Sequence, residues 1–387
     1  MSDTTPLRSL QLHSLLHADG MQDLFLEDVA IPEPGPEEVV LRIEAAPVNP
    51  SDIGVLIGGA DVGKATVIEI GGRPALRMPV PERAMRAFAA RVGLSIPCGN
   101  EGAGTVVRAG SSTAAQALLG RRVAGIGGGG MYGEYRCLQL EQCLALPEGA
   151  TAEEGASCFV NPLTALGMVE TMKLEGHRAL VHTAAASNLG QMLNRICLKD
   201  GVPLVNIVRK PEQADLLRAQ GAMHVCSTSS PTFMEELTDA LAATGATLAF
   251  DAIGGGKLAG QILACMEAAI SRTAPGFNRY GSNVLKQVYI YGGLDLSPTE
   301  ITRSFGMCWG VGGWLLFPFL NRVGPAMTAA LKQRVADELH TTFASHYARR
   351  IPLAGMMDPA EAAGYGARTT GGKYLVLPQA QDQKAPG

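Results

Sequence analysis

The sequence predicts an α/β protein with two domains, one of which is a doubly wound parallel sheet. Helical and strand patterns alternate from about residue 151, which is typical of parallel strands joined by crossover helices. Before residue 150, short apolar or alternating runs are separated by glycine and proline, which indicates a second, β-rich domain. A length of 387 residues accommodates both domains.

The β-rich region begins after a turn rich in proline at residues 32–36. Glycines at 127–130 predict a loop, and residues 374–377 predict a last strand that rejoins this domain from the tail. An amphipathic helix is expected at residues 81–92. The strands expected in this region are at residues 39–43, 105–107, 122–126 and 135–138.

The second region alternates regularly. One or two helices are expected within residues 152–173. Such a sheet binds its ligands beyond the carboxyl ends of its strands. The elements expected next are strands at 179–182, 203–208, 224–226, 247–251 and 287–291, with helices at 191–199, 211–220, 231–244 and 258–269.

The composition excludes several classes of protein. With 47% hydrophobic and 18% charged residues, the chain can bury a sizeable core, and a net charge of −4 gives no sign of a nucleic-acid partner. The apolar run at 304–321 is interrupted by glycines and barely long enough to span a bilayer, so no membrane partner is expected. Eight cysteines without C-x-x-C spacing, and no visible secretory signal, indicate a cytoplasmic protein with free thiols.

The most informative segment is the strand, turn, helix and strand at residues 179–208. Its turn carries Ala184-x-x-Ser187-x-x-Gly190 where dinucleotide-binding folds carry G-x-G-x-x-G. Small residues let the backbone approach a pyrophosphate, and the N–H groups of a helix start attract anions. Such a turn also serves packing alone, but the second strand ends at the spacing that the motif requires. The residues expected at the pyrophosphate are Ala186, Ser187, Asn188, Leu189 and Gly190.

The end of that second strand predicts which cofactor binds. Arg209 and Lys210 stand where NAD-binding folds place an acid for the ribose 2′-hydroxyl. A carboxylate there repels a 2′-phosphate, whereas a guanidinium can hold one with two hydrogen bonds. The sequence therefore predicts NADPH rather than NADH. Four further residues at strand ends are expected to line the same crevice, namely Asp251, Gly254, Gly292 and Gly293.

Four segments carry a family resemblance. They are Ala46-Pro47-Val48-Asn49-Pro50-Ser51-Asp52, Gly99-Asn100-Glu101-Gly102-Ala103-Gly104, Asn161-Pro162-Leu163-Thr164-Ala165, and the tail Arg368-x-Thr370-x-Gly372-x-x-Leu375-x-Leu377-Pro378. They resemble, in turn, the V-N-P-S-D segment, the G-H-E-x-x-G turn, the opening of the cofactor domain and the R-x-T-x-G-x-x-L-x-I-P ending. Together they resemble the medium-chain dehydrogenase/reductase superfamily, in particular its zinc-free branch of quinone oxidoreductases and enoyl reductases.

The resemblance implies a GroES-like catalytic domain, residues 1–155 and 319–387, and a Rossmann domain, residues 156–318, that binds NADPH. It implies that Asn49 lies beside the nicotinamide and the substrate, with Asp52 close behind. Without the resemblance, Asn49 is a turn residue before Pro50. It also implies a homodimer, and it adds Thr164, Trp314 and Arg368 to the cofactor site.

The resemblance bears on metals as well. Zinc-dependent members place a cysteine where Asn49 stands, a histidine where Asn100 stands and their third ligand near Val160. Neither an amide nor valine matches the Cys, His or carboxylate ligands of catalytic zinc, and the four-cysteine structural loop is absent, so no metal is expected. The cysteines that match no standard spacing are interpreted as buried free thiols: Cys98, Cys137, Cys143 and Cys158.

Hydride transfer to an acceptor that is already electrophilic then fits best. Quinones and conjugated enones qualify, because the developing negative charge spreads to a carbonyl oxygen. Enoyl-thioester reductases of this branch use a tyrosine shortly after N-P-S-D as the proton donor, but residues 53–80 contain no tyrosine. Tyr132, in the glycine loop, is the nearest substitute by sequence context.

Two insertions leave alternatives open. Residues 58–93 exceed the family pattern and form either a lid that shapes specificity or an oligomer contact. Residues 271–283 carry Tyr280, which is either a cofactor contact or part of a solvated basic loop.

The sequence thus predicts a cytoplasmic, zinc-independent, NADPH-dependent reductase of quinones or related conjugated carbonyl compounds. An NADPH-dependent enoyl or enone reductase with a bulky substrate is the alternative among enzymes. A non-catalytic NADPH-binding protein is the alternative from another class, and the lack of an obvious acid–base residue favours it.

Overall fold

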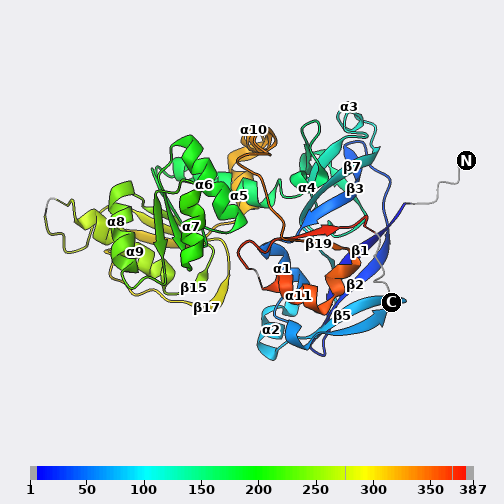
Figure 1. Ribbon diagram of the computed structural model, residues 1–387, viewed down its shortest axis with the longest axis horizontal. Helices are drawn as coiled ribbons and strands as arrows, with labels where there is room; N and C mark the ends of the chain where they lie inside the picture. Colours follow the sequence, from blue (N-terminus) through cyan, green and yellow to red (C-terminus); the bar gives the residue numbers. More distant parts are fainter. Residues whose placement is uncertain (1–6, 275, 368, 381–387) are drawn as a thin grey trace, which may run out of the picture. The chain divides into compact units, whose positions relative to one another are not determined.

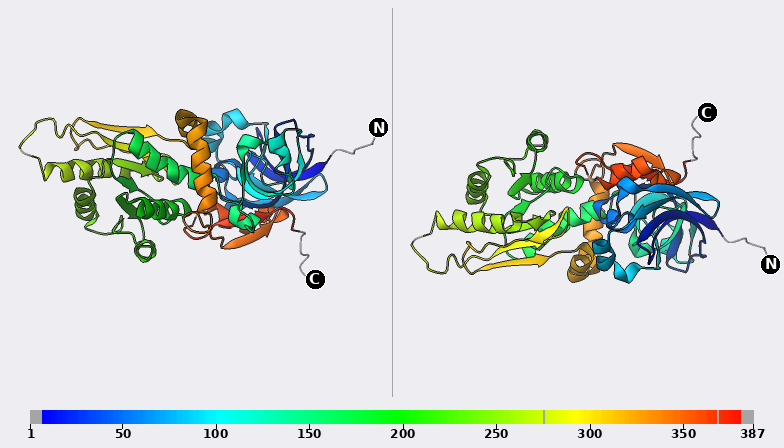
Figure 2. Two further views of the ribbon diagram at one scale, coloured as in Figure 1. Left: turned by 90° about the horizontal axis from the view of Figure 1, so that it is seen from above. Right: turned by 90° about the horizontal axis from the view of Figure 1, so that it is seen from below.

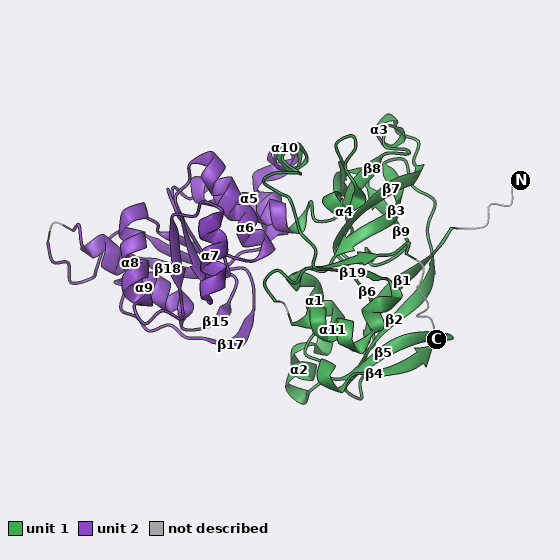
Figure 3. Cartoon of the chain, in the orientation of Figure 1, with its two compact units in different colours: residues 1–160, 332–387 green, residues 161–331 purple. Residues whose placement is uncertain are grey.

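The computed structural model describes residues 7–274, 276–367 and 369–380, and the chain forms two compact units (Figure 3). Unit 1 comprises residues 1–160 and 332–387, and unit 2 comprises residues 161–331. The expected domain limits, after residues 155 and 318, remain a prediction, whereas the compact units change after residues 160 and 331. Arg368 lies outside the described residues.

Unit 1 contains two sheets (Figure 1). The five-stranded sheet has the order β4-β5-β2-β1-β6, and the seven-stranded sheet has the order β10-β8-β7-β3-β20-β19, with β9 paired to β3. All pairs are antiparallel except β19 with β20. The strands are β1 (Arg8–Leu16), β2 (Met21–Ala30), β3 (Glu38–Pro47), β4 (Thr66–Ile70), β5 (Arg73–Pro79), β6 (Ser95–Pro97), β7 (Glu101–Ala109), β8 (Arg122–Ile126), β9 (Tyr135–Gln139), β10 (Cys143–Ala145), β19 (Arg349–Pro352) and β20 (Tyr374–Leu377).

The helices of unit 1 are short. The α-helices are α1 (Pro50–Leu56), α2 (Glu82–Ala87), α3 (Thr113–Gln116), α4 (Ala152–Gly155) and α11 (Pro359–Gly366). The 3-10 helices are η1 (Val62–Lys64), η2 (Ala89–Arg91), η3 (Leu140–Gln142) and η4 (Ala354–Met357). The helix expected over residues 81–92 is therefore two shorter pieces, α2 and η2, which meet at Phe88.

The tail strand completes the first unit, as the sequence predicts. In β20, Leu375 and Val376 pair with Pro47 and Ala46 at the end of β3, and both tail residues are fully buried. One apolar core joins side chains of β1, β3, α1 and α11. The segment after β3 starts α1, so this pairing fixes the backbone from which Asn49 and Asp52 project.

The insertion at residues 58–93 is packed tightly onto unit 1. Its hairpin, β4 and β5, extends the five-stranded sheet at its edge through β2. A Cβ atom on Gly59 would lie 2.3 Å from the Cβ of Ala84, so α2 touches the backbone after α1 directly. Arg91 donates to the carbonyl oxygens of Gly54 and Val55 at 2.9 and 3.0 Å. These contacts attach the insertion to the helix that carries Asp52.

Unit 2 contains the predicted doubly wound parallel sheet. Its strands follow the order β13-β12-β11-β14-β16-β18, and every pair is parallel. The order reverses between β11 and β14, and ligands of such sheets bind at this point, beyond the carboxyl ends of the strands. The strands are β11 (Leu180–His182), β12 (Leu204–Val208), β13 (His224–Ser227), β14 (Leu248–Asp251), β16 (Lys286–Ile290) and β18 (Trp309–Gly313), with a separate pair β15 (Gly254–Gly256) and β17 (Asp295–Thr299).

Helices alternate with these strands, as expected. They are α5 (Val160–Leu174), α6 (Asn188–Asp200), α7 (Pro211–Ala219), α8 (Phe233–Thr244), α9 (Leu258–Ser271) and α10 (Leu316–Asp337). Apolar side chains of α8 and α9 pack on Val181, Val205 and Ala249, which point to one face of the sheet. Gly324, with φ +79°, divides α10 into two parts, and Figure 2 shows the bend between them. Over the described ranges, no helix is long and apolar enough to cross a bilayer.

Candidate functional site

The turn between β11 and α6 is built as an anion-binding helix start. The helix begins at Asn188, three residues earlier than the sequence predicts, because Ser187 caps it. The Ser187 Oγ accepts a hydrogen bond from the Gly190 N–H at 3.1 Å. Residues Asn188 to Gly190 therefore form the first helical turn, where N–H groups lack helical acceptors and the helix dipole is positive.

Close packing in this turn requires small residues. A Cβ atom on Gly190 would lie 2.2 Å from the carbonyl oxygen of Ala185, which is backbone and cannot rotate away. Ala184 has a φ of +50°, the only positive value at a non-glycine position among the described residues. Ala185 and Ala186 are buried. The turn thus brings backbone, rather than side chains, to the end of β11, which is the form that a bound pyrophosphate requires.

Two neighbouring loops at the strand ends press backbone against backbone. A Cβ atom on Gly254 would lie 2.7 Å from the Gly292 carbonyl oxygen, and one on Gly292 would lie 2.7 Å from the Ala252 carbonyl oxygen. Asp251 is fully buried and accepts from the Thr183 hydroxyl at 2.7 Å and from the Ile253 and Gly254 N–H groups. The structure therefore places Asp251 as the residue that shapes these loops.

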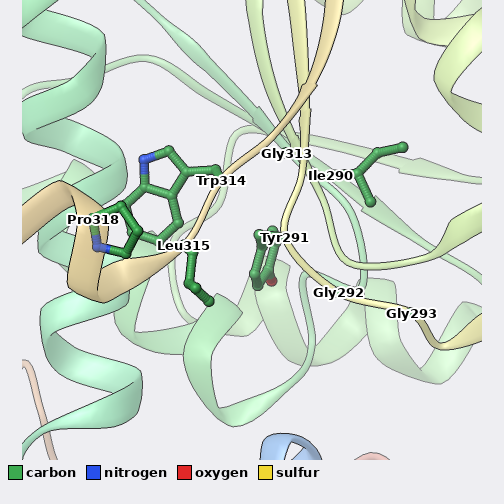
Figure 4. Close-up of a pocket in the computed structure, with 8 residues that line it drawn as sticks. All are labelled: Ile290, Tyr291, Gly292, Gly293, Gly313, Trp314, Leu315 and Pro318. Carbon is green, nitrogen blue, oxygen red and sulfur yellow. The ribbon is translucent and has the colours of Figure 1, made fainter. Parts of the chain in front are cut away.

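A pocket of about 500 Å³ opens beyond β16 and β18 (Figure 4). The Trp314 indole stands on one side of it, with its N–H donated to the Thr171 hydroxyl at 3.0 Å. A Cβ atom on Gly167 would lie 3.0 Å from this indole, so the glycine makes room for it. The lining residues are Ile290, Tyr291, Gly292, Gly293, Gly313, Trp314, Leu315 and Pro318. The pocket is large enough for a planar ring, and Trp314 makes one of its walls aromatic.

The sequence did not indicate the pair behind this pocket. The Tyr291 hydroxyl lies 2.7 Å from the His182 Nε2, and the two rings stack. His182 is fully buried, and burial lowers the pKa of its imidazole to about 3. A neutral histidine therefore fixes the rotamer of Tyr291. The one sequence signal was an unusual histidine inside an apolar strand.

The basic pair lies at the end of β12, as predicted. Arg209 and Lys210 are both exposed, and their backbone N–H groups donate to the Gln213 Oε1 at 3.1 Å each. Neither side chain forms an ion pair with any described residue. The charges are thus available, on a backbone that the Gln213 amide holds in place.

In unit 1, Asn49 and Asp52 come together at the start of α1. Asn49 is the N-cap residue, and its N–H donates to the Asp52 Oδ2 at 2.8 Å. The Asp52 Oδ1 accepts from the Asn100 N–H at 3.0 Å. Both side chains are buried, and burial raises the pKa of Asp52 to about 7. The backbone of the second predicted segment, residues 99–104, is thereby tied to the first.

Glu101 is the residue that sequence reasoning missed at this centre. Its Oε1 accepts from the Asn49 Nδ2 at 2.7 Å, and its Oε2 accepts from the N–H groups of Phe159 and Val160 at 2.8 and 2.9 Å. The side chain is buried. Because Glu101 stands inside the predicted turn motif, the sequence contained it, but a carboxylate in a glycine-rich turn is ordinarily exposed.

The other predicted residues differ in their surroundings. Tyr132 is fully buried beside Asp52, and its hydroxyl donates to the Pro47 carbonyl oxygen at 3.0 Å, so its role as a proton donor stays a prediction. Tyr280 is 59% exposed, and the Arg279 guanidinium stacks on its ring. Thr164 is buried within α5. The predicted contact of Arg368 falls on a position that the structure does not describe.

The positions at which the resemblance would place zinc ligands carry other side chains here. The Asn49 Nδ2 faces a carboxylate as a hydrogen-bond donor, and the Asn100 Nδ2 donates to the Ser51 hydroxyl at 3.3 Å. A donating amide nitrogen has no lone pair for a metal. Across the described ranges, no group of three or more His, Cys, Asp or Glu side chains is arranged to hold a metal ion.

This fold and these sites define a class. The sequence model of the alcohol dehydrogenase GroES-like domain matches residues 35–148, most of the N-terminal segment of unit 1. Together with the doubly wound sheet of unit 2, this match gives the chain the two-part fold of the medium-chain dehydrogenase/reductase superfamily.

Individual relatives are more distant. A protein of Mesorhizobium loti, described as a candidate NADPH:quinone reductase, is 26% identical and superposes with a TM-score of 0.71 over 97% of this chain and 100% of its own. A quinone oxidoreductase of Pseudomonas aeruginosa is 29% identical over 42% of this chain and 50% of its own. A mitochondrial enoyl-[acyl-carrier-protein] reductase of Xenopus tropicalis is 27% identical over 57% of both chains. The matched region thus spans about half the length of these curated relatives.

Proposed function

We propose that the protein is an NADPH-dependent oxidoreductase that reduces quinones or related conjugated carbonyl compounds. The observation that carries this proposal is the exposed Arg209–Lys210 pair at the end of β12, beside a small-residue helix start. Similarity to a quinone oxidoreductase and to a candidate NADPH:quinone reductase supports the choice of acceptor.

The residues of unit 2 fit the cofactor. The helix start at Ser187 to Gly190 would hold the pyrophosphate, and Arg209, helped by Lys210, would pair with the 2′-phosphate. Gly292, Gly293 and Trp314 would hold the nicotinamide ring in the pocket beyond β16 and β18. Thr164, Asp251, Gly254, Tyr280 and Arg368 complete the proposed cofactor set. When bound, NADPH supplies the hydride.

The residues of unit 1 would orient the acceptor. Asn49 offers a buried amide whose orientation Glu101 controls, and Asp52 holds the backbone of Asn49 in place. Since the side chains of Asn49, Asn100 and Val160 do not suit zinc, the proposed acceptor is one that needs no Lewis acid. Quinones and enones meet this requirement, because their carbonyl oxygen takes up the developing charge.

NADPH oxidation by the purified protein tests the proposal, with a panel of quinones and linear enones as acceptors and NADH in parallel. Turnover of quinones with NADPH, and much slower turnover with NADH, is the expected result. Turnover confined to enones or enoyl thioesters would favour the second candidate, an enoyl reductase, which the similarity to the Xenopus enzyme supports. Tight NADPH binding without any turnover would favour a binding protein.

The zinc content, the oligomeric state and the cellular location are measured separately. We propose that the enzyme acts without zinc, and elemental analysis that finds one tightly bound zinc per chain would contradict this. We propose that the protein is a homodimer, which light scattering tests through the mass in solution. We also propose that it is cytoplasmic, which cell fractionation tests.

A further inference from the structure

Glu101 is a buried carboxylate with three hydrogen-bond donors. Two of them are backbone N–H groups of Phe159 and Val160, and the third is the Asn49 Nδ2. Burial raises the pKa of Glu101, and the positive charge of Lys373 opposes this rise more than any hydrogen bond does. An ionised Glu101 can only accept, so it attracts the NH₂ end of the Asn49 amide.

The charge of Lys373 acts on this carboxylate, and Lys373 lies beside Ser157, two residues before Phe159, whose N–H donates to Glu101. It stands directly before β20, and its Nζ donates to the Ser157 Oγ at 2.7 Å. The Ser157 Oγ lies 2.9 Å from the Tyr347 hydroxyl, and the Lys373 Nζ lies 5.7 Å from the centre of the Tyr347 ring. The ammonium is therefore held by a hydroxyl and an aromatic face. Burial lowers the pKa of Lys373 to about 8, while Glu101 and Asp52 favour its charged form.

Few other charges reach this centre. The titratable groups that face Glu101 are Lys373, Asp52, Cys158 and Tyr347, and those that face Lys373 are Glu101, Asp52 and Cys158. Among these described residues, Lys373 is the one cation that acts on Glu101, and the groups that face Lys373 include no second cation. Burial raises the pKa of the Cys158 thiol and of the Tyr347 hydroxyl, so neither supplies a charge near neutral pH. Lys373 is therefore the charge that favours the ionised form of Glu101, together with its three hydrogen-bond donors.

We propose that Lys373, acting through Glu101, fixes which end of the Asn49 amide points away from the carboxylate. Lys373 and Glu101 are then positioning residues of the reductase, while Ser157 and Tyr347 hold Lys373 in place. Without the ammonium, Glu101 takes up a proton and can donate it in a hydrogen bond to the Asn49 Oδ1. The Asn49 amide group then rotates so that its oxygen, rather than its NH₂ group, points to Glu101. For its role in turnover, this inference rests on the proposed function.

The first test reads the Asn49 amide without cofactor or substrate. The protein is labelled with ¹⁵N at asparagine, and the Asn49 side-chain signal is assigned by its loss in Asn49→Ser. At about pH 6, where Lys373 with its pKa of about 8 is charged, we expect the wild-type signal at a single position that reports the NH₂ end facing Glu101. In Lys373→Met, measured at the same pH, the signal should lie at a new position. Glu101→Gln should show the new position at every pH, which keeps the test available if Lys373→Met does not fold.

The second test measures turnover. Lys373→Met should lower kcat by about tenfold or more with a much smaller change in the KM of the acceptor, because orientation rather than binding is lost. Lys373→Arg retains the charge and should restore most of kcat, and Ser157→Ala should have an intermediate effect. Lys332→Met is the matched control. Lys332 is another half-buried lysine of unit 1, but its Nζ donates to the Glu141 carbonyl oxygen, and it faces no buried carboxylate among the described residues.

The outcomes separate the two proposals. An Asn49 signal that is the same in wild type, Lys373→Met and Glu101→Gln would overturn the positioning role. Equal losses of kcat in Lys373→Arg, Lys373→Met and Lys332→Met would also overturn it, because packing alone would then explain them. If the wild type reduces no acceptor, but the Asn49 side-chain signal still differs between wild type and Lys373→Met, the proposed function fails and the positioning role stands.

Discussion

The two candidate sites are built from opposite materials. In unit 2, the site at the strand ends is made by omitting side chains, so that backbone at Gly190, Gly254 and Gly292 lies within contact of neighbouring backbone. In unit 1, the site is made by burying ionisable side chains, namely Asp52, Glu101 and the ammonium of Lys373. The first should therefore be sensitive to added volume, and the second to changes of charge and pH.

The largest effect is expected from Asp52 in unit 1. Its pKa rises from 3.8 to about 7 on folding, so the folded protein keeps a proton that the unfolded chain releases. The stability that this proton provides is complete below about pH 4 and is lost as pH rises through about 7, by roughly 4 kcal/mol. Calorimetry across this range should show the free energy of unfolding falling as pH increases.

Asp52→Asn is the matched variant, since it keeps the shape and cannot titrate. It should be less stable than the wild type at low pH, because one of its two polar atoms becomes a donor that faces an N–H group. Its pH dependence should be flatter. If the free energies of unfolding of the two proteins had the same pH dependence, Asp52 would ionise normally. The comparison of unit 1, as a site of buried ionisable groups, with unit 2 would then fail.

Gly190→Ala should have the next largest effect and should act through volume. The added methyl group would lie 2.2 Å from the Ala185 carbonyl oxygen, so the turn must move. We expect a loss of about 1–3 kcal/mol in stability, and weaker NADPH binding in calorimetric titration, because the N–H groups shift with the turn.

Gly54→Ala provides the contrast within unit 1. Gly54 lies inside α1, and a Cβ atom there would meet nothing within 4 Å. The substitution should be neutral or slightly stabilising, since alanine favours the helix by up to about 1 kcal/mol. If Gly190→Ala and Gly54→Ala lower the free energy of unfolding equally, the close approach at Gly190 is not the cause of the lost stability.

Arg209→Ala should sharpen the assignment of the cofactor. Loss of a charge-assisted hydrogen bond costs about 1.5–3 kcal/mol, so NADPH should bind roughly ten- to a hundredfold more weakly. NADH, which lacks the 2′-phosphate, should bind about as before. Glu212→Ala, an exposed acid in the next helical turn, is the charge-change control. Equal weakening of both cofactors would assign a structural role to the arginine.

The smallest effect is expected at the helix cap. Ser187→Ala removes the acceptor of the Gly190 N–H and should cost about 1 kcal/mol of stability. Ser187→Asp retains an acceptor and should recover that stability, but its charge should weaken NADPH binding. Urea denaturation and cofactor titration measure the two effects separately, and a fully stable Ser187→Ala would show that the cap contributes nothing.

Local patterns accounted for much of unit 2. The alternation of helix and strand, the small-residue turn and the basic pair after β12 all belong to segments of about thirty residues, so their period and spacing are visible in the chain. The start of α6 was placed three residues late, because Ser187 was interpreted as part of the turn rather than as a cap. The glycines at 292 and 293 were expected at the cofactor, whereas Tyr291 and its partner His182 were not.

Unit 1 was less accessible to the same reasoning. Asn49 and Asp52 were selected by resemblance, and the role of Asp52 in binding two backbone N–H groups is visible only in the structure. Tyr132 was predicted as a proton donor from its position in a glycine loop; packing of that loop against β1 buries it beside Asp52, and its role remains a prediction. Exposure of such a residue depends on strands that are remote in sequence.

The sequence by itself determined the two-part organisation, the return of the tail to the first unit, the parallel character of the second sheet and the charge at the end of β12. These features follow from periodicity and local composition. Only the tertiary structure decided that the charges of Glu101 and Lys373 act on each other and that Asp52 is buried. Desolvation and pairing of charges depend on which distant segments meet, and β7, the residues before α5 and the tail meet only in the folded chain.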